Sequence, residues 1–259
     1  MVMPPLPDSV VFCGTVIPID DFDMRERLDR ELVINTYYHS STIQILKRAN
    51  RYFPEIEKIL REEKMPDDLK YIAVIESGLA QVTSPSGAKG FWQFMPAAAE
   101  QYGLVINQDV DERFHVAKST HAACAFFRNS QRKFNDWILS SAAYNCGPKG
   151  LQDQIDFQKT DDFFDLYLNR ETSRYVFRIL ALKIIMSDPE AYGYPIDKLE
   201  MYKEPDTKAV EVTETIADLS AWVRENGSNL RALKRLNTWL LTNRLPVSGN
   251  SYTIKLPRE

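Results

Sequence analysis

The sequence predicts a mainly α-helical protein that ends in a small α+β module. Apolar residues make up 44% of the 259 residues, enough to bury a sizeable core, and they recur at helical spacing up to residue 186. Prolines and glycines then punctuate a connector at 189–205. Beyond it, two alternating segments flank two short helical patterns. We therefore expect a helical domain over 1–200 and a module over 205–259.

The helical domain begins with a Pro-rich segment at 1–20, which we expect to be irregular. In chain order, helices are predicted at 21–37, from a cap at Ser41, from Pro54, and at 67–77, 97–103, 112–133, 136–145, 161–169 and 172–186. Pro54 is placed at a helix start because proline lacks the N–H that an interior position donates. Gly78 favours the left-handed conformation that ends a helix, so the 67–77 helix is expected to stop there.

The module is predicted as strand, helix, helix and strand. The strand-like alternation covers 210–212 and 252–256, and the helical patterns cover 216–224 and 228–236. A unit of about 50 residues is small but feasible as a module.

Glu76 is a lone acid at the end of a predicted helix, and no second carboxylate follows it up to residue 99. It shares the inner face of that helix with Ile72 and Ala73. Burial and the negative potential of a helix C-terminus both raise the pKa of a carboxyl group. Such a group can protonate a glycosidic oxygen near neutral pH. The alternative is a structural Glu76 paired with an Arg or Lys in the core.

The segment at 84–96 is rich in glycine and aromatic residues. Its glycines permit tight turns and the close approach of a ligand to the backbone. Phe91, Trp92 and Phe94 can either stack on sugar faces or fill the core. Gln93 can hydrogen-bond an amide. Because most glycosidases use two carboxylates, a lone acid beside this segment predicts glycosidic cleavage without a carboxylate nucleophile.

A third cluster, AAYNCG at 142–147, ends another predicted helix. Tyr144 and Asn145 project from the helix end, where a phenol can stabilise charge or relay a proton. The alternative is a plain helix end capped by Gly147.

Four motifs thus occur in order, namely ESGL at 76–79, GAKGFWQFMP at 87–96, AAYNCG at 142–147 and ETSRYV at 171–176. Together they resemble the family 1 lytic transglycosylases, especially the membrane-bound lytic murein transglycosylase D group, which share the goose-type lysozyme fold. The match covers about 60–186, and KRANRYFP at 47–54 and PDDLKY at 66–71 resemble the lead-in of that group. The resemblance implies a lysozyme-like helical catalytic domain.

Carried over residue by residue, the resemblance implies Glu76 as the catalytic acid and base, with Tyr144 assisting at the reacting sugar. The substrate-binding residues that it implies are Ser84, Gln93, Met95, Asn145, Glu171 and Tyr175. The chain departs from the family pattern at Gly78, Leu79 and Cys146, none of which carries a reacting group.

The resemblance further implies a peptidoglycan lytic transglycosylase that cleaves the β-1,4 bond between N-acetylmuramic acid and N-acetylglucosamine. Glu76 would protonate the glycosidic oxygen and then take the proton of the muramoyl C6 hydroxyl, whose oxygen closes a 1,6-anhydro ring. No metal or cofactor is needed. Two alternatives are a muramidase, hydrolysing as goose-type lysozyme does, and a non-catalytic protein that binds cell-wall glycans.

The C-terminal unit resembles a LysM module in SNLRALKRLN at 228–237 and LPVSGNSYTIKLP at 245–257. Such modules bind glycans that contain N-acetylglucosamine. The usual Gly-Asp before the first helix is replaced by VTET at 212–215, so glycan binding and a purely structural role both stay open.

Composition argues against several other classes of protein. A net charge of −4 is atypical of a dedicated nucleic-acid-binding protein. The histidines and cysteines lack metal-site spacing. We expect Cys124 and Cys146 to be buried as small hydrophobes, with a disulfide left open.

No apolar run reaches the roughly 18 residues of a membrane-spanning helix, and no export signal is visible at the N-terminus. The expected chemistry nevertheless favours a periplasmic or cell-envelope location, with the export signal outside this sequence and peptidoglycan glycan strands as the partner. An N-terminal anchor outside this sequence would attach such an enzyme to a membrane.

Overall fold

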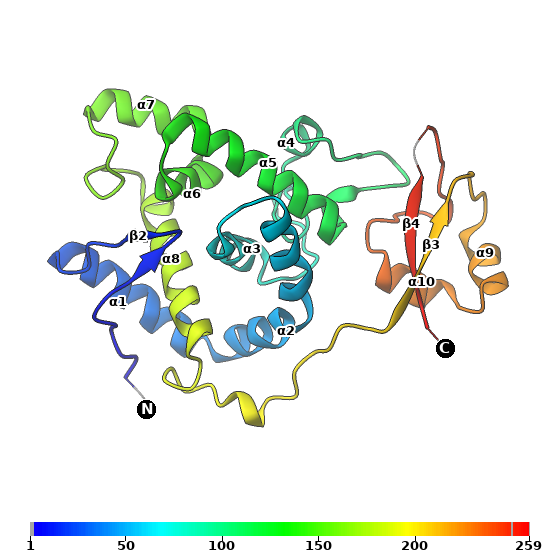
Figure 1. The fold of residues 1–259 in the computed structure, drawn as a ribbon, viewed down its shortest axis with the longest axis horizontal. Coiled ribbons are helices and arrows are strands. Elements are labelled where there is room, and N and C mark those ends of the chain that lie inside the picture. The colour runs from blue at the N-terminus through cyan, green and yellow to red at the C-terminus, as the bar shows by residue number, and fades with distance from the viewer. Residues whose placement is uncertain (1–2, 250, 259) are drawn as a thin grey trace. The chain divides into compact units, whose positions relative to one another are not determined.

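The computed structural model describes residues 3–249 and 251–258, and most of this chain is helical, as predicted (Figure 1). It divides into two compact units, Met1–Leu79 with Ala123–Tyr202 (unit 1) and Ala80–Ala122 with Lys203–Glu259 (unit 2). Across the described residues, no helix is long and apolar enough to cross a membrane.

Unit 1 is built around one central helix, α8 (Arg170–Ser187), which packs against α1, α3 and α6 (Figure 1). The other elements of this unit are β1 (Val11–Phe12), β2 (Thr15–Val16), α1 (Phe22–Tyr37), α2 (His39–Glu62), η1 (Asp67–Leu69), α3 (Lys70–Ser77), the C-terminal part of α5 (Val116–Phe134), α6 (Trp137–Cys146), α7 (Pro148–Gln158) and η3 (Ile196–Lys198). A helix with buried side chains on most of its circumference belongs in the core. Between Tyr175 and Leu182 every residue of α8 except Arg178 is buried, which makes α8 such a helix.

Helix α2 runs unbroken through Pro54, so the predicted helix starts at Ser41 and Pro54 are wrong. Ala49 and Ile56 are seven residues apart and both buried, which places them on one stripe that continues across the proline. Each large apolar side chain buried on that stripe contributes about 1.5–3 kcal/mol. The continuous stripe therefore offsets the roughly 3 kcal/mol that an interior proline costs.

The predicted helix at 161–169 is also wrong, because this segment consists of a turn and of residues without regular secondary structure. Phe163 and Leu166 are both buried there and lie three residues apart, which imitates helical spacing. A helix that was not predicted, α7, precedes this segment. Its only buried residue is Leu151, so its sequence carries little apolar periodicity. The 1–20 segment likewise contains the short β1–β2 hairpin in place of wholly irregular chain.

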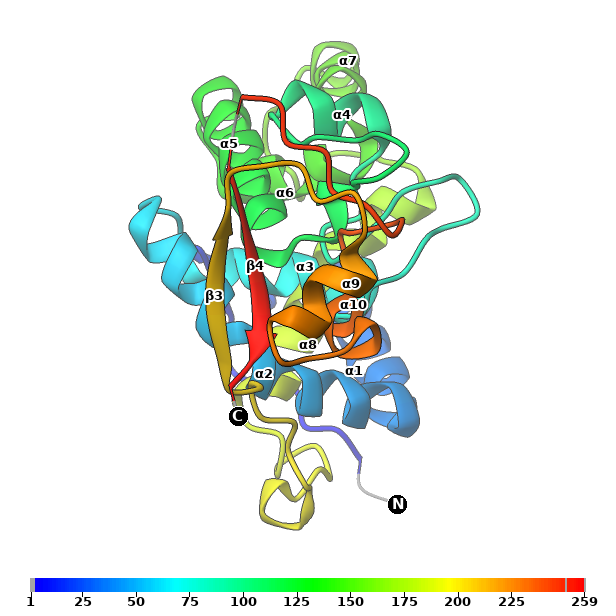
Figure 2. The same cartoon turned by 90° about the vertical axis from the view of Figure 1, so that its right-hand side faces the viewer.

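Unit 2 contains the predicted order of strand, helix, helix and strand. Its elements are α4 (Pro96–Gln101), η2 (Glu112–Phe114), the N-terminal part of α5, β3 (Thr207–Val212), α9 (Leu219–Glu225), α10 (Leu230–Leu236) and β4 (Tyr252–Pro257). Strands β3 and β4 pair antiparallel, with Thr207 opposite Pro257 and Val212 opposite Tyr252, and lie side by side in Figure 2. Asp218 and Asn229 cap the two helices.

The core of unit 2 joins the C-terminal elements to the loop around Val110. Val110 is fully buried in the same cluster as Leu233 and Ile254, and it forms a β-bridge with Leu240. The Thr238 hydroxyl also donates a hydrogen bond to the Phe114 carbonyl at 2.8 Å. The domain limits 1–200 and 205–259 stay predictions. The loop around Val110 precedes residue 205 and shares a core with the elements that follow it.

The cysteines are free thiols. Cys124 is buried as predicted, whereas Cys146 is only partly buried because it lies in the last turn of α6. Among the described residues, no group of three or more His, Cys, Asp or Glu side chains is arranged to hold a metal ion.

Candidate active site

The C-terminal turn of α3 presents Glu76 in unit 1. Residues 71–74 are buried and fix the helix in the core. Gly78 adopts φ +59° and its N–H donates to the Val74 carbonyl at 2.8 Å, so the predicted stop at Gly78 is confirmed. Leu79 follows with φ +55°, a conformation that is strained for a non-glycine residue, and its side chain is buried. The chain therefore turns sharply just after the predicted acid.

Tyr175 of α8 is the direct partner of Glu76. Its phenol Oη donates a hydrogen bond to Glu76 Oε1 at 2.5 Å, and its side chain is buried. Within the described chain, Glu76 forms no ion pair. The geometry therefore differs from the alternative of a structural Glu76 neutralised by a core Arg or Lys.

The environment of Glu76 raises its pKa from an ordinary value of 4.5 to about 7. Burial is the largest cause, because it disfavours the charged form. The hydrogen bond from Tyr175 and the charge of Arg178 lower the pKa, and the charge of Glu171 raises it again. Burial and the Glu76 charge also raise the pKa of Tyr175, which keeps its phenol protonated as a donor.

Tyr144 and Asn145 lie at the C-terminal end of α6. The Tyr144 ring stacks on Phe127 with centroids 5.1 Å apart and meets Phe126 edge-on at 4.8 Å, and Tyr144 also contributes to the raised pKa of Tyr175. Asn145 Oδ1 accepts a hydrogen bond from the Thr172 hydroxyl at 2.9 Å. Asn145 thus ties the end of α6 to the first turn of α8.

Two further α8 residues act on Glu76 through their charge. Glu171 is exposed in the first turn, and Arg178 is partly buried and approaches the Ile75 carbonyl with its Nη2 at 3.5 Å. Sequence reasoning missed Arg178. The signal was its position three residues after Tyr175 and seven after Glu171, because such residues share one face of a helix. Five of the predicted site residues, Glu76, Tyr144, Asn145, Glu171 and Tyr175, therefore belong to unit 1.

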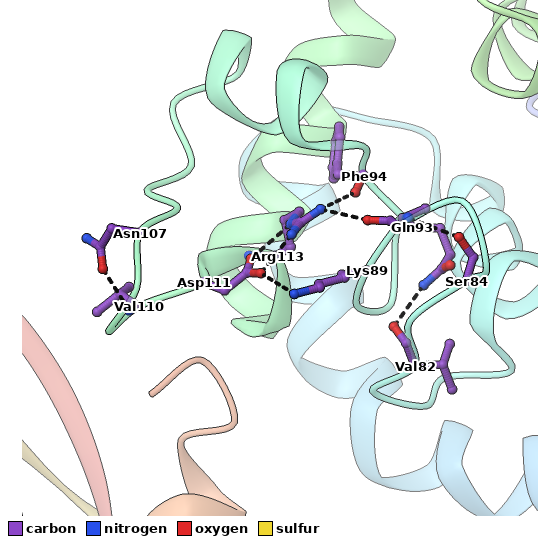
Figure 3. A network of polar contacts seen from close by, with 11 residues as sticks. Val82, Ser84, Lys89, Gln93, Phe94, Asn107, Val110, Asp111 and Arg113 are labelled. Carbon is purple, nitrogen blue, oxygen red and sulfur yellow. Dashed lines mark hydrogen bonds and ion pairs between the residues drawn. The ribbon is translucent and has the colours of Figure 1, made fainter. Parts of the chain in front are cut away.

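Ser84, Gln93 and Met95 belong to unit 2, where two of them hold the glycine-rich loop together. The Ser84 hydroxyl accepts from the Ala88 N–H at 3.0 Å. Gln93 Nε2 donates to the Gly90 carbonyl at 2.7 Å and to the Val82 carbonyl at 3.2 Å (Figure 3). Met95 is 44% exposed. The binding roles of these three residues stay predictions.

The same loop is fastened by Arg113, which sequence reasoning missed. Arg113 Nη1 donates to the carbonyls of Gly87 at 3.0 Å and Phe94 at 3.2 Å, and its other nitrogens form a bidentate pair with Asp111 (Figure 3). A Cβ on Gly90 would lie 1.9 Å from the Arg113 carbonyl oxygen, so only glycine fits there.

The three aromatic residues of the loop are core residues. Phe91, Trp92 and Phe94 are at most 4% exposed, and Trp92 Nε1 donates to the Thr120 hydroxyl at 2.9 Å. Of the two predicted alternatives, filling the core is what the structure shows.

Comparison with known proteins identifies both parts of the chain. Residues 53–166 match the model of the Transglycosylase SLT domain, and residues 208–259 match that of the Soluble lytic transglycosylase C-terminal LysM-like domain. The chain carries an SLT domain and a LysM-like domain. Of the predicted site residues, only Glu171 and Tyr175 lie beyond the end of the SLT match.

Two curated relatives cover almost the whole of this SLT and LysM-like chain. The Membrane-bound lytic murein transglycosylase D proteins of Escherichia coli K12 and of Escherichia coli O6:H1 are each 29% identical to it over 253 residues, which is 94% of this chain. The alignment covers 53% of each relative, so the chain spans about half the length of the curated relatives that it matches.

Proposed function

We propose that this protein is a peptidoglycan lytic transglycosylase in which Glu76 is the general acid and then the general base. The observation that carries the proposal is the state of Glu76. Its carboxyl has a pKa raised to about 7, accepts a hydrogen bond from the Tyr175 phenol and forms no ion pair within the described residues. A general acid–base group works best when its pKa lies near the operating pH.

The reaction proposed here needs one proton and returns it. Protonated Glu76 gives its proton to the glycosidic oxygen as the bond from C1 of N-acetylmuramic acid to that oxygen breaks, and the electron pair leaves with the oxygen. The resulting carboxylate then takes the proton of the C6 hydroxyl, and that oxygen bonds to C1 to close the 1,6-anhydro ring. Glu76 ends protonated, as it began. Tyr175 holds the carboxyl in one orientation throughout because its own phenol stays protonated.

Glycan strands of peptidoglycan are the proposed substrate and partner. The names of both relatives describe murein transglycosylases, and the SLT and LysM-like domains occur together in this chain. We propose a cell-envelope location on the same ground, since the relatives are described as membrane-bound. Glycan binding by the LysM-like domain and the substrate contacts of Ser84, Gln93, Met95 and Asn145 belong to the same proposal.

Mass spectrometry of digested peptidoglycan tests this function. Purified protein should release muropeptides that are lighter by one water than the products of a muramidase, because the 1,6-anhydro ring replaces the reducing end. The Glu76→Gln protein serves as the control for contaminating enzymes. Reducing ends in place of anhydro ends would show a hydrolase, and undigested peptidoglycan would contradict a role in cleavage.

A further inference from the structure

A cavity in unit 1 is lined by four arginines, and Glu76 is not among its lining residues. Its volume is about 100 Å³, and it opens between Arg27, Arg30 and Glu31 of α1 and Arg170 and Arg174 of α8. We call it the arginine pocket. Such a volume holds a group of about three water molecules, which suits a carboxylate or a phosphate group.

Two of the arginines have structural partners. Arg174 forms a bidentate pair with buried Glu31, through Nε at 2.7 Å and Nη2 at 3.1 Å. Arg27 lies over the Phe177 ring at 4.7 Å, donates to the Ser173 carbonyl at 3.2 Å and approaches Asp23 at 3.4 Å. These contacts fasten α1 to α8 and explain why both residues are there.

Arg30 and Arg170 have no such explanation. Both are exposed at the pocket, and neither side chain forms a hydrogen bond or an ion pair with another described residue. Like charges held close together are destabilising unless an opposite charge joins them. Glu31 and Asp23 are already engaged by Arg174 and Arg27. The pocket therefore presents two guanidinium groups whose donors are available to an anion.

The pocket and the candidate active site use adjacent faces of α8. Arg170 and Arg174 are four residues apart and face the pocket, whereas Tyr175, one residue further on, faces Glu76. A helix with its side chains is about 10 Å across. An extended peptide covers about 3.3–3.6 Å per residue, so one of three or four residues attached to a sugar near Glu76 can reach the pocket.

We propose that the arginine pocket binds a carboxylate carried by the peptides of the glycan substrate. Guanidinium groups match carboxylates bidentately, which is why Arg is preferred for this contact. The proposal rests on the proposed function for its substrate, since murein strands carry short peptides with free carboxylates on their muramic acid residues. The pocket would thereby favour strands that keep their peptides over strands that have lost them.

Calorimetric titration in a Glu76→Gln background measures this preference without turnover. The two probes are a soluble murein oligomer and the same oligomer after an amidase has removed its peptides. We expect the peptide-bearing oligomer to bind about tenfold more tightly, as charge-assisted contacts at a partly exposed site allow. The additional double change Arg30→Ala with Arg170→Ala should abolish the preference, and it leaves the pair of Arg174 with Glu31 in place.

The matched control is Arg25→Ala with Arg132→Ala in the same background. These arginines are exposed in unit 1 and outside the pocket, so the control loses the same charge. It should keep the tenfold preference. Equal affinity for the two oligomers in the parent protein, or a preference that survives the loss of Arg30 and Arg170, would overturn the proposal.

Titrations with a free acidic tripeptide and with inorganic phosphate separate the remaining outcomes. If the parent binds phosphate through Arg30 and Arg170 while the peptides make no difference, the pocket serves phosphate and the proposal fails. If neither oligomer binds, the proposed function fails, and the tripeptide still decides about the pocket. Tripeptide binding that depends on Arg30 and Arg170 would retain the carboxylate site, and its absence would remove it.

Discussion

Two carboxyl groups of this protein, partly buried Glu76 in unit 1 and buried Asp111 in unit 2, have opposite electrostatic states. Burial acts to raise the pKa of both Glu76 and Asp111. For Asp111 the hydrogen bonds and charges of Arg113 and Lys89 outweigh burial, and its pKa is lowered. For Glu76 the neutral phenol of Tyr175 and the more distant charge of Arg178 do not outweigh burial, and its pKa rises to about 7.

The partner of an acid that is withdrawn from water therefore indicates its role better than the degree of burial does. An acid that two cations hold in its charged form fastens a loop, as Asp111 does through Arg113 (Figure 3). An acid whose partner is a neutral donor can gain and lose a proton near neutral pH, as a general acid and base must. Four substitutions test this distinction, in order of decreasing expected effect.

Glu76→Gln should reduce cleavage of peptidoglycan by at least 10³-fold, because one group performs both proton transfers and each such role contributes about 10²–10⁴-fold. The amide keeps the shape of the side chain and can accept the Tyr175 hydrogen bond. The measurement is the initial rate of soluble muropeptide release, beside a thermal melt. A folded Glu76→Gln protein with a wild-type rate would remove Glu76 from the mechanism.

Asp111→Asn should reduce the free energy of unfolding by about 3 kcal/mol, because it leaves the buried Arg113 guanidinium without a counter-charge. Urea denaturation at neutral pH measures this loss. The folded fraction of the variant should still cleave at a rate far above that of Glu76→Gln. A loss below about 1 kcal/mol would place this pair among ordinary surface ion pairs.

The stabilisation by Asp111 should depend on pH in a definite direction. The pKa of Asp111 is lowered in the folded protein relative to an ordinary value of 3.8. Its stabilising contribution is therefore complete above that ordinary value and is lost as the pH falls through the folded-state pKa. The stability difference between wild type and Asp111→Asn should shrink in that acidic range, whereas a difference that is constant with pH would contradict the ion-pair explanation.

Tyr144→Phe should lower kcat by about 10-fold with little change in KM, if its hydroxyl acts only on the transition state. The ring contacts with Phe126 and Phe127 are retained, so the fold should be unaffected. Steady-state kinetics on a soluble oligomer measure both constants. An unchanged kcat would assign Tyr144 to the packing of the α6 end alone.

Local patterns were sufficient to predict the position of Glu76. Its helix, its inward face and the stop at Gly78 all depend on residues within one or two turns, and the order of the four C-terminal elements depends on similar short patterns. The raised pKa followed from burial on that face. These features could be read from the sequence because neighbouring residues alone determine them.

The partners of the two acids could not be predicted in the same way. Tyr175 is separated from Glu76 by 99 positions, and no single pattern shows which distant residue the fold brings to a carboxyl. Arg113 is fixed by tertiary contacts with the carbonyls of Gly87 and Phe94. The helix start predicted at Pro54 is wrong because tertiary packing decides there too. Packing along α2 overrides the local preference of proline for a helix start.

Tyr175→Phe gives the smallest expected effect and the most direct reading of how the acid is tuned. The hydrogen bond from Tyr175 lowers the pKa of Glu76, so its removal should raise that pKa further above about 7. Cleavage begins with protonated Glu76, and wild-type kcat/KM should therefore decline as the pH rises through about 7. In Tyr175→Phe this basic limb should move to higher pH, by no more than about one unit, since one hydrogen bond contributes on the order of 1 kcal/mol. Tyr144→Phe is the control, because it keeps the hydrogen bond between Tyr175 and Glu76. The basic limb of its pH profile should stay where the wild-type limb lies. A basic limb that moves to lower pH in Tyr175→Phe would contradict this tuning, because it would mean that the Tyr175 hydrogen bond favours protonated Glu76. A wild-type kcat/KM that instead rises with pH through about 7 would mean that Glu76 reacts from its ionised form, and the contrast with Asp111 would then not mark the catalytic acid.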